Sequence, residues 1–176
     1  MAKTYNSIPS VATGDVYTAA AHNAIATNVN NYRVPPMCLV YRSSDLSGYT
    51  SDADITWNAE SYDTDEMFTP SGTTITIGTA GLYLVSFYVY FVGLATITNV
   101  SMRIRVNGAT AMTHFGATGS TGVYSTAALT LSLAASDTVA ARVGVAGGSS
   151  YSVAGNADPR NQNASRLSLT WLGQVS

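Results

Sequence analysis

The sequence predicts an all-β sandwich or barrel preceded by one short helix. Three features indicate this fold: a long apolar run between two glycines, an alternating strand that ends in an Asn-Gly turn, and further short β-prone segments separated by turns. No helical pattern interrupts the β-prone segments after Pro36, which argues against an α/β fold. The 176 residues suffice for about one domain with an appendage.

The apolar run is GLYLVSFYVYFVG, residues 81–93. It is shorter than the roughly 20 residues of a membrane-spanning helix, and its Tyr, Phe and Val residues favour a strand over a buried helix. In a strand, alternate side chains point to opposite faces. The expected core face carries Tyr83, Val85, Phe87, Val89 and Phe91. The second face carries Leu82, Leu84, Ser86, Tyr88 and Tyr90. The second face is too apolar for open solvent, so a second layer of the chain or another subunit must cover it.

The remaining strands follow from shorter patterns. Residues 99–108 alternate cleanly, and Asn107-Gly108 is a strong hairpin signal with 110–115 as the partner strand. Residues 147–164 form a turn-rich loop expected at one end of the molecule. The other expected strands are 37–42, 54–57, 73–77, 123–133, 137–146 and 165–173, which gives eight or nine strands in all.

The N-terminal segment differs in character. Residues 18–33 are rich in alanine, Thr18 is a suitable N-cap, and Val34-Pro35-Pro36 ends the helix. A helix with so narrow an apolar stripe is marginal alone, so it is expected to pack on a neighbour. We therefore divide the chain into an arm, residues 1–36, and a β-domain, residues 37–176. The stripe comprises Ala21, Ile25, Val29 and Tyr32, and the polar face offered to a protein partner comprises Asn23, Asn28, Asn30 and Asn31.

Composition excludes several classes of function. Charged residues make up 10% of the chain, the formal net charge is −2 and Lys3 is the only lysine, so no basic surface for nucleic acid is expected. Cys38 stands alone, and we interpret it as a buried small hydrophobe, not a reactive thiol. The N-terminus lacks the apolar core of a signal peptide, which predicts synthesis in a cytoplasm without membrane insertion.

The sequence offers little for catalysis. His22 and His114 are the two histidines, and the chain contains neither a Gly-x-Ser-x-Gly elbow nor a phosphate-binding Gly-rich loop. We therefore expect no catalytic residues, no cofactor and no metal required for folding.

An acidic segment at residues 45–66 holds seven of the ten carboxylates: Asp45, Asp52, Asp54, Glu60, Asp63, Asp65 and Glu66. Such a segment can bind calcium, but its spacing matches no known calcium loop. We favour a solvated acidic loop that faces Arg42, Arg103 or Arg105.

The β-domain resembles the C1q/tumour-necrosis-factor (TNF) jelly roll. The resemblance covers about residues 37–175 loosely, and Val85 stands where that family usually has Phe, a volume that Phe87 can replace. It implies an antiparallel jelly roll that forms a compact homotrimer, with Leu82, Leu84, Tyr88 and Tyr90 in the trimer interface. The matching residues are Gly81, Tyr83, Asn107, Gly108, Asp137, Val139 and Leu167 to Leu172.

The N-terminal stretch TGDVYTAAAHNAIATNVNNYRVPP resembles a leader found in structural proteins of tailed bacteriophages. Together with a trimeric jelly roll, this implies a virion surface protein whose arm docks on the particle through Ile25, Val29 and Tyr32. The residues that fit the leader are Gly14, Asp15, Val16, Thr18, Ala19, Ala20, Asn23 and Asn28.

Three functions remain open at this stage. The first is a capsid decoration or head-fibre protein that binds the major capsid protein or another virion protein through its arm. The second is a tail-tip or tail-fibre adhesin that contacts host surface glycans, with Tyr124 and Tyr151 at a glycan-contacting tip as the alternative to an ordinary exposed rim. The third, a secreted C1q-like ligand, is disfavoured because signal peptide and collagen repeat are both missing from the sequence.

Overall fold

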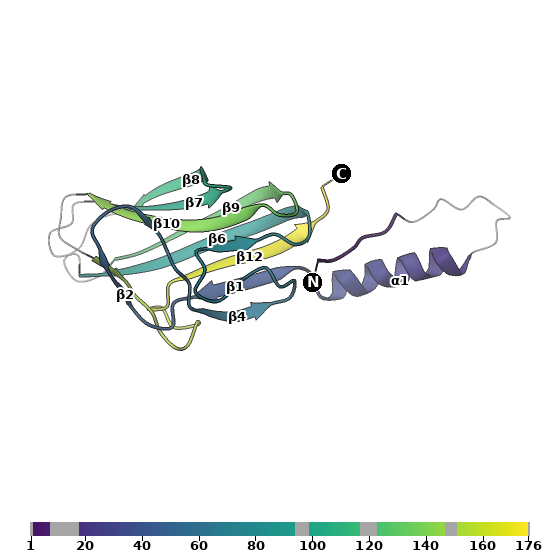
Figure 1. The fold of residues 1–176 in the computed structure, drawn as a ribbon, viewed down its shortest axis with the longest axis horizontal. Helices are drawn as coiled ribbons and strands as arrows, with labels where there is room; N and C mark the ends of the chain where they lie inside the picture. The colour runs from purple at the N-terminus through teal and green to yellow at the C-terminus, as the bar shows by residue number, and fades with distance from the viewer. Residues whose placement is uncertain (1, 8–17, 94–98, 117–122, 147–150, 176) are drawn as a thin grey trace.

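The protein is a two-layer antiparallel β-sandwich with a helical arm at one end (Figure 1). The structure is a computed structural model that describes residues 2–7, 18–93, 99–116, 123–146 and 151–175. Its elements are α1 (Ala19–Arg33), β1 (Met37–Tyr41), β2 (Leu46–Tyr49), β3 (Ala53–Asp54), β4 (Ala59–Asp63), β5 (Thr74–Thr76), β6 (Gly81–Val92), β7 (Asn99–Val106), β8 (Ala109–Gly116), β9 (Val123–Leu133), β10 (Thr138–Ala146), β11 (Tyr151–Val153) and β12 (Arg166–Gly173).

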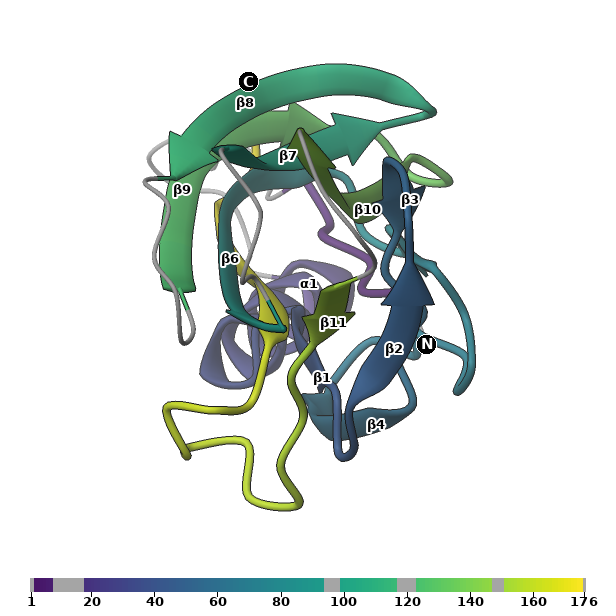
Figure 2. The same cartoon turned by 90° about the vertical axis from the view of Figure 1, so that its left-hand side faces the viewer.

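Two sheets enclose one core, as the view from the end opposite the arm shows (Figure 2). The seven-stranded sheet, here called the large sheet, has the order β2-β11-β6-β12-β1-β4, with β9 on the other edge of β6. The five-stranded sheet, here called the small sheet, has the order β3-β10-β7-β8, with β5 also paired to β10. The predicted all-β antiparallel sandwich is therefore confirmed.

The core face of β6 is the one that the alternation predicted. Tyr83, Val85, Phe87, Val89 and Phe91 have no exposed surface. They pack between the sheets against buried residues of the small sheet, among them Val100, Met102 and Ile104.

The hairpin at Asn107-Gly108 also matches its prediction. Both residues have positive φ angles, 51° and 80°, as a two-residue hairpin turn requires. The Asn107 side chain then ties this turn to the next one, because its Nδ2 donates to Asp137 Oδ1 at 2.7 Å and its Oδ1 accepts from the backbone N–H of Thr138 at 2.9 Å.

Two local predictions were wrong. The expected strand 54–57 has ladder pairing at Asp54 alone, because the buried residues Ile55 and Trp57 donate their backbone N–H groups separately, to Ala141 and Gly72. The expected loop 147–164 contains strand β11, which pairs with the unpredicted strand β2. Strand β4 was also missed and pairs with β1.

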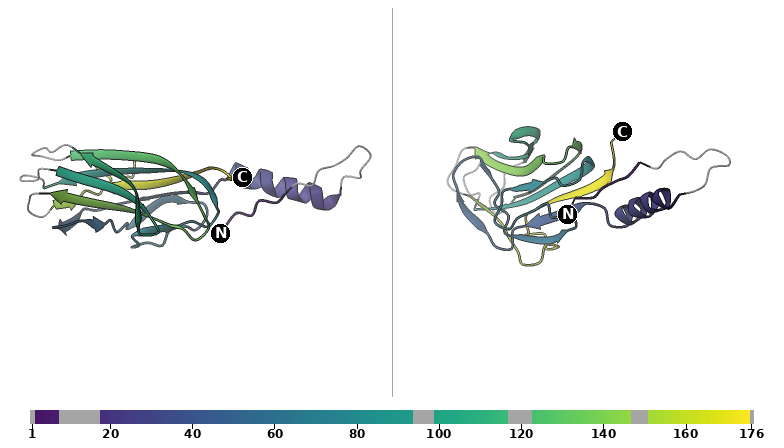
Figure 3. Two further views of the ribbon diagram at one scale, coloured as in Figure 1. Left: turned by 90° about the horizontal axis from the view of Figure 1, so that it is seen from above. Right: turned by 45° about the vertical axis from the view of Figure 1, so that its right-hand side comes forward.

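The arm projects from one end of the sandwich (Figures 1 and 3). Helix α1 begins after Thr18, whose hydroxyl accepts the N–H of Ala21 at 3.2 Å, as an N-cap should. The joint at Pro35 and Pro36 is fixed to the sandwich, since Thr64 donates to the Pro35 carbonyl at 2.6 Å and the Trp171 N–H donates to the Pro36 carbonyl at 3.0 Å.

Candidate functional site

The outer face of the large sheet is the first surface with functional potential. Strand register places Leu82, Leu84, Tyr88 and Tyr90 on this face of β6, which pairs with β9 along its length and with β12 as far as Tyr88. Among the residues that β9 and β12 pair with β6, Arg166 is the one charged residue, and its guanidinium lies 4.6 Å from the centre of the Tyr88 ring. The face is thus apolar and aromatic, with small hydroxyl side chains between.

The chain covers this face incompletely. Leu84 is 39% exposed, and Leu82, Tyr88 and Tyr90 are half-buried. The Tyr88 hydroxyl donates to the Gln162 carbonyl, and burial raises the pKa of this hydroxyl. The structure therefore brings the four predicted residues together on one half-covered surface.

Residues 2–7 form an irregular segment of the arm that runs beside helix α1. The side chain of Asn28 makes paired 2.8 Å hydrogen bonds with the backbone N–H and carbonyl of Asn6. Asn31 donates to the Thr4 carbonyl at 2.5 Å. The arm itself thus uses the amides of Asn28 and Asn31, which we predicted to face a protein partner, whereas Asn23 and Asn30 are exposed.

The apolar stripe of the arm is divided between two environments. Ala21 is buried and Ile25 is half-buried, whereas Val29 is 52% exposed and Tyr32 is 56% exposed. Tyr32 also lies edge-on to Tyr5, with ring centroids 5.3 Å apart. Helix α1 thus presents apolar side chains that the described residues of this chain leave open.

A buried polar cluster joins the arm to the sandwich. The Lys3 N–H donates to Thr79 Oγ1 at 2.6 Å, and this hydroxyl donates to Asp65 Oδ2 at 2.8 Å. Asp65 is 2% exposed, and neither its Oδ1 nor the buried hydroxyl of Tyr5 has a hydrogen-bond partner. Burial raises the pKa of the Asp65 carboxyl, while Thr79 and Lys3 partly oppose the rise.

The acidic segment faces arginines in part, but it is not the solvated loop that we favoured, because it contains strands β2, β3 and β4 and Asp65 is buried. Arg103 binds the carboxylate of Asp52, and Arg105 binds Asp54 with the nearer contact at 2.8 Å. Arg42 instead donates to the backbone carbonyls of Ser44 and Thr56. Within the described residues, no three His, Cys, Asp or Glu side chains are grouped so as to hold a metal ion.

Tyr124 and Tyr151, for which we weighed an exposed rim against a glycan-contacting tip, lie in different environments. Tyr124 is 72% exposed, but Tyr151 is 1% exposed and belongs to the core. Its ring stacks on Tyr49 at 5.2 Å and its hydroxyl donates to the Ser51 carbonyl, because strand β11 turns it inward. The sequence offered no signal for this burial, since the segment lies among glycines and serines.

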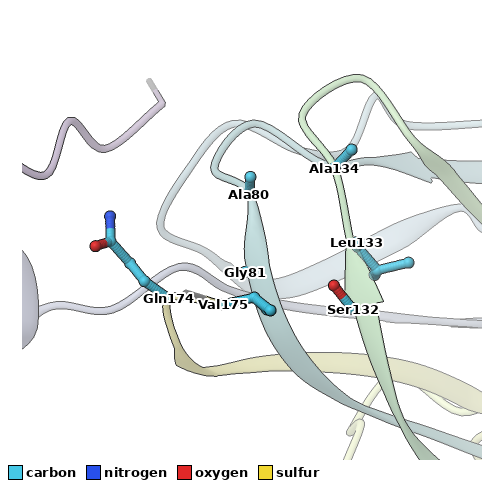
Figure 4. Close-up of a pocket in the computed structure, with 7 residues that line it drawn as sticks. All are labelled: Ala80, Gly81, Ser132, Leu133, Ala134, Gln174 and Val175. Atoms are coloured by element: carbon cyan, nitrogen blue, oxygen red, sulfur yellow. The ribbon is translucent and has the colours of Figure 1, made fainter.

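The hollow beside Gly81 lies at the arm end of the sandwich (Figure 4). It has a volume of about 380 Å³, and its lining includes Ala80, Ser132, Ala134 and Gln174 but no titratable side chain. Elsewhere, burial raises the pKa of the Cys38 thiol and holds it in the unreactive neutral form. Neither place supplies an acid, a base or an activated nucleophile.

No helix in the described part of the chain is long and apolar enough to cross a bilayer. The sequence matches no family model and no curated protein sequence.

Solved structures do match. The globular domain of zebrafish complement 1qA protein aligns with a TM-score of 0.56 at 13% identity, over 80% of this chain and 100% of that domain. Murine APRIL at pH 5.0 aligns with a TM-score of 0.56 at 12% identity, over 77% of this chain and 99% of that one. Eiger TNF from S. frugiperda aligns with a TM-score of 0.54 at 15% identity, over 81% of this chain and 96% of that one. The chain therefore has the jelly-roll fold of C1q and TNF domains.

Proposed function

We propose that this protein is a non-enzymatic homotrimer on the surface of a tailed-phage virion, a capsid decoration or head-fibre protein anchored by its N-terminal arm. The observation that carries the proposal is the half-covered apolar face of the large sheet. A two-layer sandwich has no need of leucine and tyrosine on an outer face, whereas a subunit interface does.

In the proposed trimer, the outer faces of three large sheets meet around a threefold axis and bury Leu82, Leu84, Tyr88 and Tyr90. The three arms then emerge together from the same end, because each arm projects from one end of its sandwich (Figure 3). Ile25, Val29 and Tyr32 recur at spacings of four and three residues, which suits contacts between helices or with a docking partner.

The virion assignment rests on the phage-like leader and on the chemistry of the arm. The partner is the major capsid protein or another virion protein. Nucleic acid suits this role poorly, because the chain carries a net charge of −2 and Arg103 and Arg105 are already paired with aspartates.

The test is to image particles decorated with labelled protein. Full-length protein with a gold-binding tag is added to phage particles that lack the wild-type copy, and electron microscopy locates the label. Label on the capsid supports decoration, and label at the tail supports the second candidate below. If no label binds any particle, the virion assignment fails.

The second candidate is a tail-tip or tail-fibre adhesin that contacts host surface glycans. An exposed aromatic side chain favours it: Phe115 of the small sheet is 64% exposed, whereas Tyr124, which is 72% exposed, pairs with Tyr90 of the proposed trimer interface. Both lie near one end of the sandwich, since Gly116 of β8 is next to Ser125 of β9. That end is away from the arm, where an anchored protein would meet a host surface (Figure 1).

A further inference from the structure

The outer face of the small sheet carries an exposed aromatic ring beside a set of polar groups. Phe115 near the end of β8 is 64% exposed, and it is the one large apolar side chain that the described part of this sheet leaves in solvent. In the register of β7 and β8 it lies opposite Ser101. A ring in this position offers a flat apolar surface that the described residues leave largely open.

A carboxylate is fixed on the other side of Ser101. Asp52 reaches across strand β10 to bind the guanidinium of Arg103 on β7. It can do so because Gly144 lies beneath it: a Cβ atom there would lie 2.6 Å from Asp52 Cγ. Arg142 holds the same loop by donating to the Asp52 carbonyl at 3.1 Å. Two arginines on adjacent strands thus position this acidic side chain.

Between the ring and the ion pair the surface is hollowed. The hollow has a volume of about 140 Å³, below the roughly 300–1,000 Å³ of sites that enclose a drug-sized ligand. Its size suits a single ring held at the surface. Its lining residues are Asp52, Asn99, Ser101, Arg103, Phe115 and Val145.

We infer that this hollow is a saccharide-binding site that takes one terminal, uncharged sugar ring. A pyranose has an apolar C–H face, which packs on Phe115, and hydroxyl groups on its edges. Those hydroxyls can donate to the Asp52 carboxylate and accept from the Arg103 guanidinium or the Asn99 amide, and hydrogen bonds to ionised groups are the stronger kind.

The same groups disfavour other ligands. The charged residues that line the hollow are Asp52 and Arg103, and because they neutralise each other, a phosphate or a sulfated group finds no unpaired cation in the lining. One exposed phenyl ring is too small a surface for a membrane or an apolar helix. An uncharged ring with an apolar face and hydroxyl groups on its edges matches the exposed phenyl ring and the polar groups of this hollow.

This inference deepens the second candidate function and rests on it only for the biological source of the sugar. The site lies on the opposite sheet from the proposed trimer interface, so assembly leaves it open on each subunit. Three copies on one trimer would convert weak single-site binding into tighter attachment to a dense glycan surface.

The test is saturation-transfer NMR on the full-length protein with a panel of methyl glycosides. The panel contains glucose, galactose, mannose, N-acetylglucosamine and N-acetylgalactosamine, with glucuronic acid as the charged comparison. We expect transfer to at least one neutral glycoside at about millimolar affinity. Phe115→Ala should weaken it about tenfold or more, and Gly144→Ala should weaken it too, because the added methyl displaces the Asp52 carboxylate.

Tyr62→Ala is the matched control, because Tyr62 is an exposed aromatic residue of the other sheet that belongs neither to a candidate glycan surface nor to the proposed interface. It should leave glycoside binding unchanged, and thermal melts should show that all three variants remain folded. The inference is overturned if the wild type gives no transfer to any neutral glycoside at about 10 mM. It is also overturned if glucuronic acid alone binds, or if Phe115→Ala binds as the wild type does. Particle attachment of Phe115→Ala is measured separately, so loss of sugar binding and failure of the virion assignment are distinguishable.

Discussion

The ring of Tyr5 stacks on the indole of Trp171, with centroids 4.9 Å apart and planes inclined by 14°. This contact joins the first residues of the chain to its last strand and seats the arm on the sandwich. Tyr32 of helix α1 completes the cluster at 5.5 Å from Trp171.

We predict that Tyr5→Ala loosens the arm without unfolding the head. The loss of a stacked, half-buried aromatic ring should cost about 1–3 kcal/mol of unfolding free energy. Amide hydrogen exchange should quicken in α1 and remain slow in β6. Tyr5→Phe is the control, since it keeps the ring and removes a buried hydroxyl that has no partner. Unchanged exchange in α1 after Tyr5→Ala would show that the stacking does not hold the arm.

We predict that the wild type sediments as a trimer and that Tyr90→Asp dissociates it. An aspartate at this position would place an unpaired charge inside the proposed interface. Thr113→Asp is the control, because Thr113 is exposed on the small sheet, outside that interface. Sedimentation equilibrium decides the matter: a wild-type monomer at micromolar concentration, or a Tyr90→Asp trimer, contradicts the proposed assembly.

We predict that deleting residues 1–33 leaves a folded, trimeric β-domain that no longer attaches to particles lacking the wild-type protein. The truncated head should melt at a lower temperature, because the deletion removes Tyr5 from Trp171 and Lys3 from Thr79. Val29→Asp is a gentler variant, since this side chain is 52% exposed and its change spares those contacts. If the truncated head binds particles with unchanged occupancy, the anchor lies elsewhere and the arm serves only assembly.

We predict that Asp65→Asn stabilises the protein at neutral pH. The folded state raises the pKa of this carboxyl by burial, so folding favours its protonated form. The contribution of Asp65 to stability is therefore fully present below its unfolded pKa and is lost as pH rises through the raised folded pKa. The neutral amide avoids the free-energy cost of burying a charge. Each kcal/mol of unfolding free energy gained in this way should raise the melting temperature by about 2–4 °C.

The difference between Asp65→Asn and wild type should shrink as pH falls, because the wild-type carboxyl then becomes neutral as well. Comparing the two proteins at each pH cancels the opposite contribution of Asp137, whose pKa is lowered by hydrogen bonds from Asn107 and Ala134. A lower melting temperature for Asp65→Asn at pH 7 would mean that the carboxylate is stabilised by a partner.

We predict that thermal melts with and without EDTA coincide within about 1 °C, since a metal bound only to the folded state would raise its apparent stability. The aspartates Asp52 and Asp54 already have arginine partners, which leaves them poor ligands for calcium. A drop of many degrees on chelation would restore the calcium interpretation of residues 45–66.

The predictable part of the fold is the part in which local pattern and tertiary burial agree. Strand β6 and the Asn107-Gly108 hairpin belong to this class, because period-two alternation and turn chemistry both reside in adjacent residues. Ile55 and Trp57 show the limit of this reasoning. The alternating pattern correctly predicts that both side chains are buried. Burial alone does not determine which strand, if any, their backbone groups pair with.

The surfaces depend on contacts between distant residues and were harder to predict. Leu84 and Tyr88 could be assigned to an outer face because one strand carries both. The stacking of Tyr5 on Trp171, and the meeting of Asp52 with Phe115 around one hollow, join segments far apart in the chain. No local pattern in the sequence encodes either arrangement.

Strand β12 lies in the middle of the large sheet, between β1 and β6, although it follows every other described strand in the sequence. While the ribosome still holds residues 166–173, the earliest strand has only β4 beside it and β6 lacks one neighbour. The head must therefore complete its fold after residues 166–173 have left the ribosome, and such long-range pairing is slow. A nascent chain cut short before β12 would leave two open sheet edges, so we expect early termination there to yield aggregates instead of a smaller soluble head.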